Sequence, residues 1–477
     1  MATISSPGIG SGLDVNSIIT QLVAIERQPV TALQTKATKI QTQISEFGKQ
    51  KSAISTLRDA ARKLTDSGTF SATVGSSSDS AAVDVTTTTG AAIGNYAVTV
   101  QSLATAQSLA SAVFPASTST PGGGTLHIEL GGWNAGQTTF TPKTASAAVD
   151  ISIGATDTLA QVRDKINSAN AGVTALVFTD ASGSRLLMRS TATGVDNAFR
   201  TTVTDADGNN TNAAGLSALA YDPSAGAAVM TRTLAAANAA ATLNGLPVSS
   251  ASNTLTNLVD GLTLKLKSVT TSTVDVGVVQ DNESLKKTVQ TFADAYNALS
   301  TLIAGQTKYD AATKTGGPLQ GDGAAVGLQR QLRNLAGSSS TASSSFARLA
   351  DIGLATGSDG AMSVNATKLD NALANSGELK KLLSNSDLLD PAKNGIAKQF
   401  RALGDTLLGV DGPITTRSDG LRQRLDQNHA QQDKLNDRIA MTEKRLRAQY
   451  TALDTTLGKL NGLSSYVTQQ IAQFNKA

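Results

Sequence analysis

Hydrophobic side chains return every seven residues near both ends of the chain. The N-terminal series consists of Leu33, Ile40, Phe47, Ile54 and Ala61, with Ala37 and Ile44 between its members. A seven-residue repeat keeps one face of a helix against a partner, so this series predicts a long amphipathic helix with coiled-coil character over about residues 30–66. A shorter helix is expected before it, beginning after the capping residue Asp14 and running toward Pro29.

The C-terminal series is longer and runs beside a mostly polar one. Its members are Leu425, Ile439, Leu446, Leu453, Leu460, Val467 and Phe474. In the neighbouring series, leucines alternate with polar residues such as Asn428, Thr442 and Gln449. Polar residues in a seam lower stability while they restrict register. The pattern therefore predicts a helix that completes its packing against several neighbours.

We interpret these two series as an oligomer or filament interface. The hypothesis places the C-terminal series against the N-terminal residues Leu33, Ile40, Ile44 and Phe47, or against neighbouring subunits. An intramolecular helical hairpin explains the same periodicity equally well, so both interpretations stay open at this point.

Between the two helical ends, the pattern changes to the two-residue alternation of β-strands. Strands are expected at residues 96–100, 126–130, 173–178, 185–189, 262–267 and 274–279, and a helix at residues 158–169. The helical pattern returns after Asn282, with glycine-rich breaks up to residue 414. The order helix, strand, mixed, strand, helix indicates nested insertions.

The resulting prediction is an α+β multidomain fold with terminal coiled-coil helices, a helical-bundle leg domain and nested β-rich head domains. Residues 1–45 and 415–477 would form the terminal coiled-coil domain, and residues 46–69 and 283–414 the helical leg domain. Residues 70–120 and 236–282 would form a β-rich head domain, with residues 121–235 inserted in it as an outer α/β head domain.

The composition argues against several classes of function. The chain of 477 residues has no cysteine and 2 histidines, so disulfides, thiolate chemistry and multi-histidine metal sites are disfavoured. A net charge of +3 argues against nucleic-acid binding, and no apolar run approaches the roughly 18–20 residues that span a bilayer. Mixed charges over residues 421–447 favour a solvated helix face over an anion-binding site.

The short motifs that resemble catalytic or metal-binding sites each lack a residue or element that such a site requires. Residues 205–210 begin like a calcium loop, but Asn210 and Leu216 stand where an EF-hand needs glycine and glutamate. Ser284 and Lys287 have the spacing of a serine–lysine motif without its companion elements. His127 and His429 have no catalytic partner nearby in the sequence. We expect no catalytic residue, no metal site and no cofactor.

Distinctive short segments stand at residues 6–14, 18–29, 158–167, 244–248, 252–255, 260–264, 292–297, 317–322, 445–454 and 460–466. Together these segments resemble the flagellar filament cap family, also called hook-associated protein 2. The match at residues 158–187 is similar to a short module that hook-associated proteins share with flagellins. Residues 111–150 and 205–235 show little that matches.

The resemblance implies a non-enzymatic cap at the tip of the bacterial flagellum. Such proteins are secreted through the flagellar type III system without a cleaved signal peptide and form a homo-oligomeric ring of about five or six copies. The ring promotes folding and insertion of exported flagellin. Expected partners are flagellin, hook–filament junction proteins and a flagellar export chaperone, with no nucleic acid and no membrane insertion.

Two other functions stay open from the sequence. Another hook-associated junction protein, or a flagellin, would share part of the motifs quoted above. An adhesin would bind host glycans or mucin through the outer head domain at residues 121–235, although the low aromatic content weighs against sugar stacking.

Overall fold

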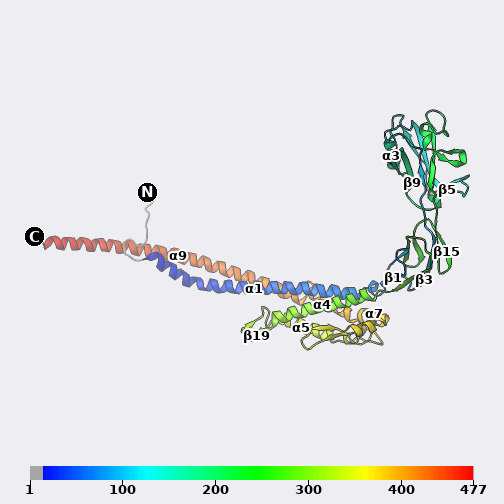
Figure 1. The fold of residues 1–477 in the computed structure, drawn as a ribbon. Helices are drawn as coiled ribbons and strands as arrows, with labels where there is room; N and C mark the ends of the chain where they lie inside the picture. The colour runs from blue at the N-terminus through cyan, green and yellow to red at the C-terminus, as the bar shows by residue number, and fades with distance from the viewer. Residues whose placement is uncertain (1–13, 145, 476–477) are drawn as a thin grey trace. The chain divides into compact units, whose positions relative to one another are not determined.

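The computed structural model describes residues 14–144 and 146–475, and the chain divides into two compact units. The first unit joins the two ends of the chain, residues Met1–Phe70 and Asn282–Ala477. The second unit is the middle of the chain, Ser71–Asp281. Helices dominate the first unit and strands the second (Figure 1). The predicted α+β multidomain class is confirmed.

The first unit is built from two very long helices and a set of shorter ones. The helices are α1 (Val15–Thr65), α2 (Ser67–Phe70), α4 (Asn282–Thr307), α5 (Gly323–Ala336), α6 (Ala366–Leu373), α7 (Ser376–Ser384), α8 (Ile396–Leu408) and α9 (Pro413–Phe474). Two small hairpins, β19 (Tyr309–Asp310) with β20 (Thr315–Gly316) and β21 (Leu354–Thr356) with β22 (Met362–Val364), and the 3-10 turns η4 (Leu349–Ile352) and η5 (Pro391–Lys393) connect them.

Helix α1 is continuous from Val15 to Thr65, so the predicted break at Pro29 is wrong. Its start is as expected, because the Asp14 carboxylate accepts a hydrogen bond from the Ser17 amide at 3.0 Å. Proline removes the amide that would bond to the carbonyl of Ile25. Pro29 and Ile25 are both exposed, so water can solvate that carbonyl. Val23 and Val30, on either side of the proline, are buried and hold the helix together.

The large core of the first unit lies between α1, α4, α5, α8 and the start of α9. Phe47 contributes from α1, and Phe292 and Tyr296 contribute from α4. Phe400 of α8 meets both aromatic rings of α4 edge-on, with ring centroids 5.1 Å from Phe292 and 6.0 Å from Tyr296. Aromatic side chains supply much of the buried area in a core, so these contacts fix the helices around α1.

Buried polar contacts also tie the long helices to the bundle. The Gln50 side chain of α1 donates to the Gln306 side chain of α4 at 2.6 Å, and Gln306 in turn donates to the Glu46 carboxylate at 2.7 Å. At the base of α9, Arg417 pairs with Asp322 at 2.7 Å. The Asp322 carboxylate also caps α5 by accepting from the Ala324 amide. Each contact fixes the register of one helix against another.

The second unit contains two hydrophobic cores. The first core uses residues between 82 and 104 and between 239 and 278. Around it lie a five-stranded sheet in the order β1-β18-β3-β14-β15 and a three-stranded sheet in the order β16-β17-β2. The strands are β1 (Thr73–Ser77), β2 (Val83–Thr87), β3 (Gly94–Ser102), β14 (Ala239–Leu243), β15 (Leu246–Ser250), β16 (Thr254–Val259), β17 (Leu262–Leu266) and β18 (Val274–Gln280).

The second core uses residues between 109 and 230 and is built around α3 (Leu159–Ser168) and two further sheets. One sheet has the order β12-β11-β10-β5-β6, with β7 also paired to β5, and the other has the order β13-β4-β9-β8. Their strands are β4 (Ser108–Ala110), β5 (Gly124–Trp133), β6 (Phe140–Pro142), β7 (Val149–Ile153), β8 (Val173–Asp180), β9 (Gly183–Ser190), β10 (Ala198–Asp205), β11 (Tyr221–Asp222), β12 (Ala227–Ala228) and β13 (Thr231–Leu234).

Local signals in this part of the sequence are confirmed. The predicted helix at residues 158–169 is α3, whose start is closed by a capping box in which Thr158 and Gln161 bond to each other's backbone amides. The predicted strands at residues 173–178 and 185–189 are β8 and β9. Short 3-10 turns, η1 (Val195–Asn197), η2 (Gly215–Leu219) and η3 (Pro223–Ala225), connect the strands between β9 and β12.

Candidate interaction surfaces of the terminal helices

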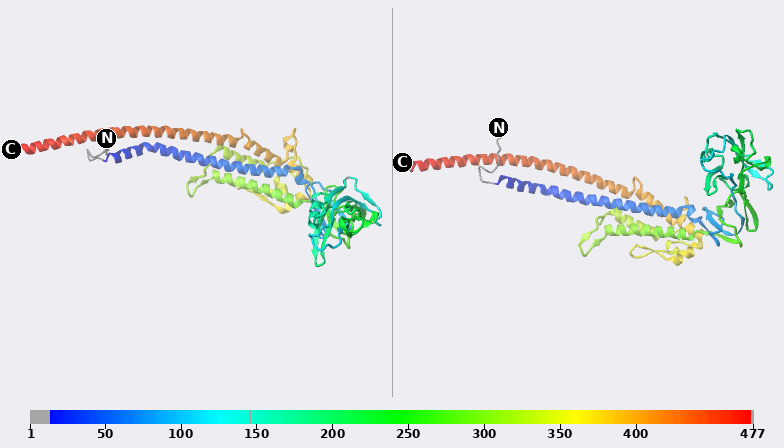
Figure 2. Two further views of the ribbon diagram at one scale, coloured as in Figure 1. Left: turned by 90° about the horizontal axis from the view of Figure 1, so that it is seen from above. Right: turned by 45° about the horizontal axis from the view of Figure 1, so that its top comes forward.

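Helices α1 and α9 run side by side, and α9 continues past the start of α1 (Figures 1 and 2). The two helices are antiparallel, because Val15 at the start of α1 packs in the same cluster as Leu446 and Tyr450 in the second half of α9. Close contact between the helices therefore ends near residue 450, and the rest of α9 has no α1 residue beside it.

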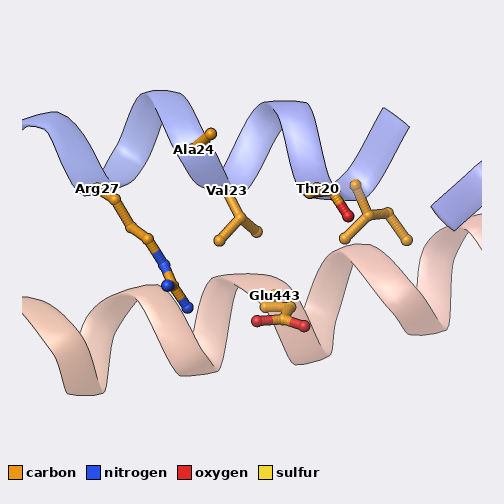
Figure 3. Close-up of a pocket in the computed structure, with 6 residues that line it drawn as sticks. Thr20, Val23, Ala24, Arg27 and Glu443 are labelled. Carbon is orange, nitrogen blue, oxygen red and sulfur yellow. The ribbon is translucent and has the colours of Figure 1, made fainter. Parts of the chain in front are cut away.

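The contact between the start of α1 and the middle of α9, which we call the upper seam, is small and aliphatic. Its buried residues are Val15, Ile19, Val23 and Val30 of α1 and Ile439 of α9. Leu435, Leu446 and Tyr450 pack against them and are partly buried. Figure 3 shows Val23 pointing from α1 toward α9 in this seam, beside a groove lined by Thr20, Ala24, Arg27 and Glu443.

Nearer the shorter helices, the later part of α1 and the start of α9 belong to the large core. Ile40 and Phe47 of α1 are buried in that core, and Ile44 packs against it. From α9, Leu421 is buried there, and Leu425 is partly buried against the same residues. In this region α9 is therefore one of several helices around α1.

The predicted interface residues lie in three different environments. Ile40, Phe47 and Ile439 are buried, and Leu33, Ile44, Leu425 and Leu446 are partly buried. Leu453, Leu460 and Val467 are exposed, at 46%, 55% and 48%. The side chain of Phe474 lies outside the part of the chain that the structure describes. Residues 1–13, which include all of the segment 6–14 except Asp14, lie outside it too.

Sequence reasoning missed the α1 residues that meet Ile439. Val23 and Val30 continue the seven-residue series of Ala37 and Ile44 toward the N-terminus. That series crosses Pro29, which was interpreted as a helix end. Extending the heptads through the proline would have found Val30 and Val23, since a proline on the exposed face of a helix does not interrupt its buried face.

The end of α9 carries an exposed apolar stripe. We call Leu453, Leu460, Val467 and Ile471 the α9 stripe; successive members are seven, seven and four residues apart, so they lie on one face of the helix. Ile471 is 56% exposed, and Leu463 beside the stripe is 61% exposed. No other described residue covers these side chains. Exposed apolar residues along one helix face make this stripe a candidate interaction surface.

The residues that first suggested chemistry are held in structural roles. His127 of β5 contacts the Asp150 carboxylate of the adjacent β7, and neither side chain is buried. The Asp205 carboxylate accepts from the amide and hydroxyl of Ser217 at 2.8 and 2.9 Å. Burial acts to raise the pKa of Asp205, but these and other hydrogen bonds together outweigh it and hold the pKa below its usual value. Gly208 has φ +82° and makes the tight turn that follows.

The described part of the chain contains no group of three or more histidine, cysteine or acidic side chains that could hold a metal ion. None of the helices described here is long and apolar enough to cross a membrane.

Models of known protein families match both ends and the middle of the chain. The model of the flagellar hook-associated protein 2 N-terminus matches residues 11–107, and that of its C-terminus matches residues 236–462. The flagellin hook IN motif matches residues 134–192. The last match contains α3, β8 and β9.

Individual proteins match over almost the whole length. Flagellar hook-associated protein 2 of Escherichia coli K12 is 33% identical, covering 98% of each chain. The protein of the same name from Salmonella typhimurium is 30% identical and covers 100% of both chains. The crystal structure of the D1-D2-D3 domains of the flagellar cap protein FliD from Escherichia coli matches with a TM-score of 0.62 at 29% identity. It covers 79% of this chain and 99% of that one.

Proposed function

Because the chain belongs to the flagellar hook-associated protein 2 family, its role is that of a flagellar filament cap, and we propose that it acts as a ring of about five or six copies. In this proposal the ring sits at the filament tip, retains each exported flagellin subunit while it folds, and lets it insert. The protein acts by binding and shape, without catalysis or a cofactor.

The α9 stripe is the observation that supports this proposal. Fully burying a valine or leucine side chain contributes about 1.5–3 kcal/mol, and the stripe residues are about half exposed. A helix that keeps four such residues uncovered stabilises itself by packing against another protein. We propose that its partners are neighbouring copies and the flagellin subunits of the filament end.

The buried members of the two series have a different role in the proposal. Ile40, Phe47 and Ile439 hold α1 and α9 together within one copy, so that the stripe is presented on a long stiff helix. Leu33, Ile44, Leu425 and Leu446 are partly buried and border the surfaces that remain open to neighbours. In this proposal α9 packs within its own copy along its first part and against other proteins along its last part.

We also propose the four-domain division from the sequence as the functional one. The terminal helices would contact the filament, the bundle would act as a leg, and the β-rich middle would form the head. Export through the flagellar secretion system, with a chaperone, and contact with hook–filament junction proteins are part of the same proposal.

The test is a pair of charge substitutions in the α9 stripe. The variant Leu453→Glu/Leu460→Glu should abolish filament growth in a strain that lacks its own cap protein and release flagellin into the medium. Both positions are exposed, so the thermal unfolding midpoint should stay within about 1–2 °C of the parent.

The matched control is Thr455→Glu/Gln469→Glu on the opposite face of the same helix, where both residues are exposed. It adds the same charge and should support normal filaments. Normal filament growth with the stripe variant would overturn the proposed role of the stripe.

A further inference from the structure

Beside the α1–α9 seam lies a groove lined by three cations that have no acidic partner. It encloses about 380 Å³, and its charged residues are Lys36 and Lys39 of α1 and Arg424 of α9. In the described part of the chain, none of the three forms an ion pair. Three positive charges converging on one groove repel each other unless an anion joins them.

An unpartnered amide group in the same groove points to a missing ligand. Asn428 of α9 lines the groove and is only 3% exposed. Its Oδ1 accepts a hydrogen bond from the Gln432 side chain at 2.6 Å, while its buried Nδ2 donates to nothing in the described structure. A buried donor without an acceptor is unfavourable, and an incoming acceptor such as a carboxylate would satisfy it.

The opposite face of α9 carries the complementary charge. Asp426 lies two residues from both Arg424 and Asn428, about 200° around the helix. Asp433 and Asp437 follow it after seven and four more residues, so the three carboxylates share one face. All three are exposed and form no ion pair within the described residues. We call Asp426, Asp433 and Asp437 the acidic face.

The second groove of the helix pair shows that the positive charge is local. That groove is lined by Ala37, Thr38, Gln41, Thr42, Ser45, Leu425 and His429, with no lysine or arginine among them. The same two helices therefore offer a cationic groove and a neutral one, and only the cationic groove contains an unpartnered buried donor.

We propose that the acidic face of one copy docks into the cationic groove of the next copy. This inference rests on the proposed ring and names surfaces that would join its neighbours. Since the groove and the acidic face lie on different sides of one helix pair, each copy can use both at once. Such a contact is head-to-tail, and repeated around an axis it closes into a ring.

The electrostatic character of the contact sets its behaviour. Exposed charges are screened by salt, with a Debye length of about 8–10 Å near physiological ionic strength. Association through these surfaces should therefore weaken as salt rises. A contact that is mainly electrostatic also exchanges readily, because charge complementarity raises association rates more than affinity.

Charge reversal in the full chain tests the pairing. Lys36→Glu/Lys39→Glu in the groove should weaken self-association, measured by sedimentation velocity, by at least about tenfold, and so should Asp426→Lys/Asp433→Lys. Combining all four substitutions restores complementarity between copies and should return association to within about threefold of the parent. Unchanged association in either double variant, or no recovery in the combination, would overturn the inference.

The absence of cysteine allows a direct second test. With Lys39→Cys/Asp433→Cys, a short thiol-specific cross-linker should give a ladder of linked copies, while either single variant should give at most dimers. The matched control Thr38→Cys/Asp433→Cys places the first thiol in the neutral groove and should give no ladder. A ladder of equal strength in the control, or none in the test variant, counts against the pairing.

Filament growth separates this inference from the proposed function. If the charge variants associate normally and also support filaments, the docking surfaces are wrong while the cap role stands. If the parent protein itself fails to restore filaments in a cap-deficient strain, the cap role fails independently of the contact.

Discussion

The two halves of α9 share one heptad series but differ in burial. In the first half, Ile439 is 3% exposed and Leu425 is partly buried against the large core. In the second half, Leu453 and Leu460 are 46% and 55% exposed. The difference is the partner, because α1 begins at Val15, level with Leu446 and Tyr450. A heptad series therefore defines which face of a helix will pack, and the neighbouring element decides whether it does.

The contrast also separates stability from assembly. Series residues up to Leu446 pack against the same copy, whereas those from Leu453 onward are exposed, and we propose that they contact other copies. Substitutions in the two halves should therefore separate into those that unfold the helical unit and those that leave it folded but inactive.

The largest expected effect is at the core end of α1. Phe47→Ala removes a fully buried ring from the large core, so the free energy of unfolding of the helical unit should fall by about 3–5 kcal/mol. Leu460→Ala removes a half-exposed side chain and should change it by less than about 0.5 kcal/mol. Denaturant unfolding of the full chain measures both.

Filament growth distinguishes the two variants by the reason for which each fails. Leu460→Ala should weaken filament growth although the protein is stable, whereas Phe47→Ala should fail through unfolding and recover at lower temperature. A large loss of stability from Leu460→Ala would show that the end of α9 is packed within the single copy.

The next effect concerns the upper seam. Ile439→Ala removes the central α9 side chain of a cluster with only four buried α1 residues. We expect a local loss of about 2–3 kcal/mol, near the lower end for isoleucine to alanine, because the small seam can partly collapse. Amide hydrogen exchange of residues 15–30 should accelerate accordingly, while the large core keeps its protection.

Met441→Ala is the matched control for that variant. Met441 lies two residues away and is 73% exposed, so its loss should leave the exchange of residues 15–30 unchanged. Equal acceleration in both variants would mean that the effect does not arise from the seam contact of Ile439.

The sequence was sufficient for the pattern-driven parts of this fold. The heptads of Phe47 and Ile439, the capping box at Thr158 and the alternation in β8 and β9 each reflect local physics that the final structure keeps. The helix break predicted at Pro29 was wrong because the cost of an interior proline depends on whether water can solvate the carbonyl that loses its hydrogen bond, here that of Ile25. The cationic groove was beyond reach, since Lys36 and Arg424 meet only after both long helices are paired.

Replacing Pro29 tests that explanation. Pro29→Ala restores an amide donor to the Ile25 carbonyl, and should stabilise α1 locally by about 1–2 kcal/mol. This is less than the roughly 3 kcal/mol of a proline forced into a helix, because the site is already exposed. Slower amide exchange over residues 25–33 would show the gain. Gln28→Ala, a control of helix propensity alone, should change it by only a few tenths of a kcal/mol.

The smallest expected effect is pH-dependent and lies away from the long helices. Glu378 of α7 binds Lys381 at 2.6 Å, and its other oxygen accepts from the Ser343 hydroxyl and the Ser344 amide, both at 2.7 Å. These bonds, the one to Lys381 first, lower the pKa of Glu378 from 4.5 to about 2. The carboxylate thereby attaches the segment around residues 343–344 to the bundle.

A carboxyl group whose pKa is lower in the folded state stabilises that state above its unfolded pKa, and the contribution disappears as pH falls through the folded value. Glu378→Gln should therefore lower the thermal midpoint by about 1–2 °C at pH 7, and the gap to the parent should close between pH 4.5 and about 2. Ser343→Ala, which removes one of the bonds, should show the same trend with a smaller gap. A gap that stays constant across this range would mean that Glu378 stabilises the bundle through packing and not through the charge of its carboxylate.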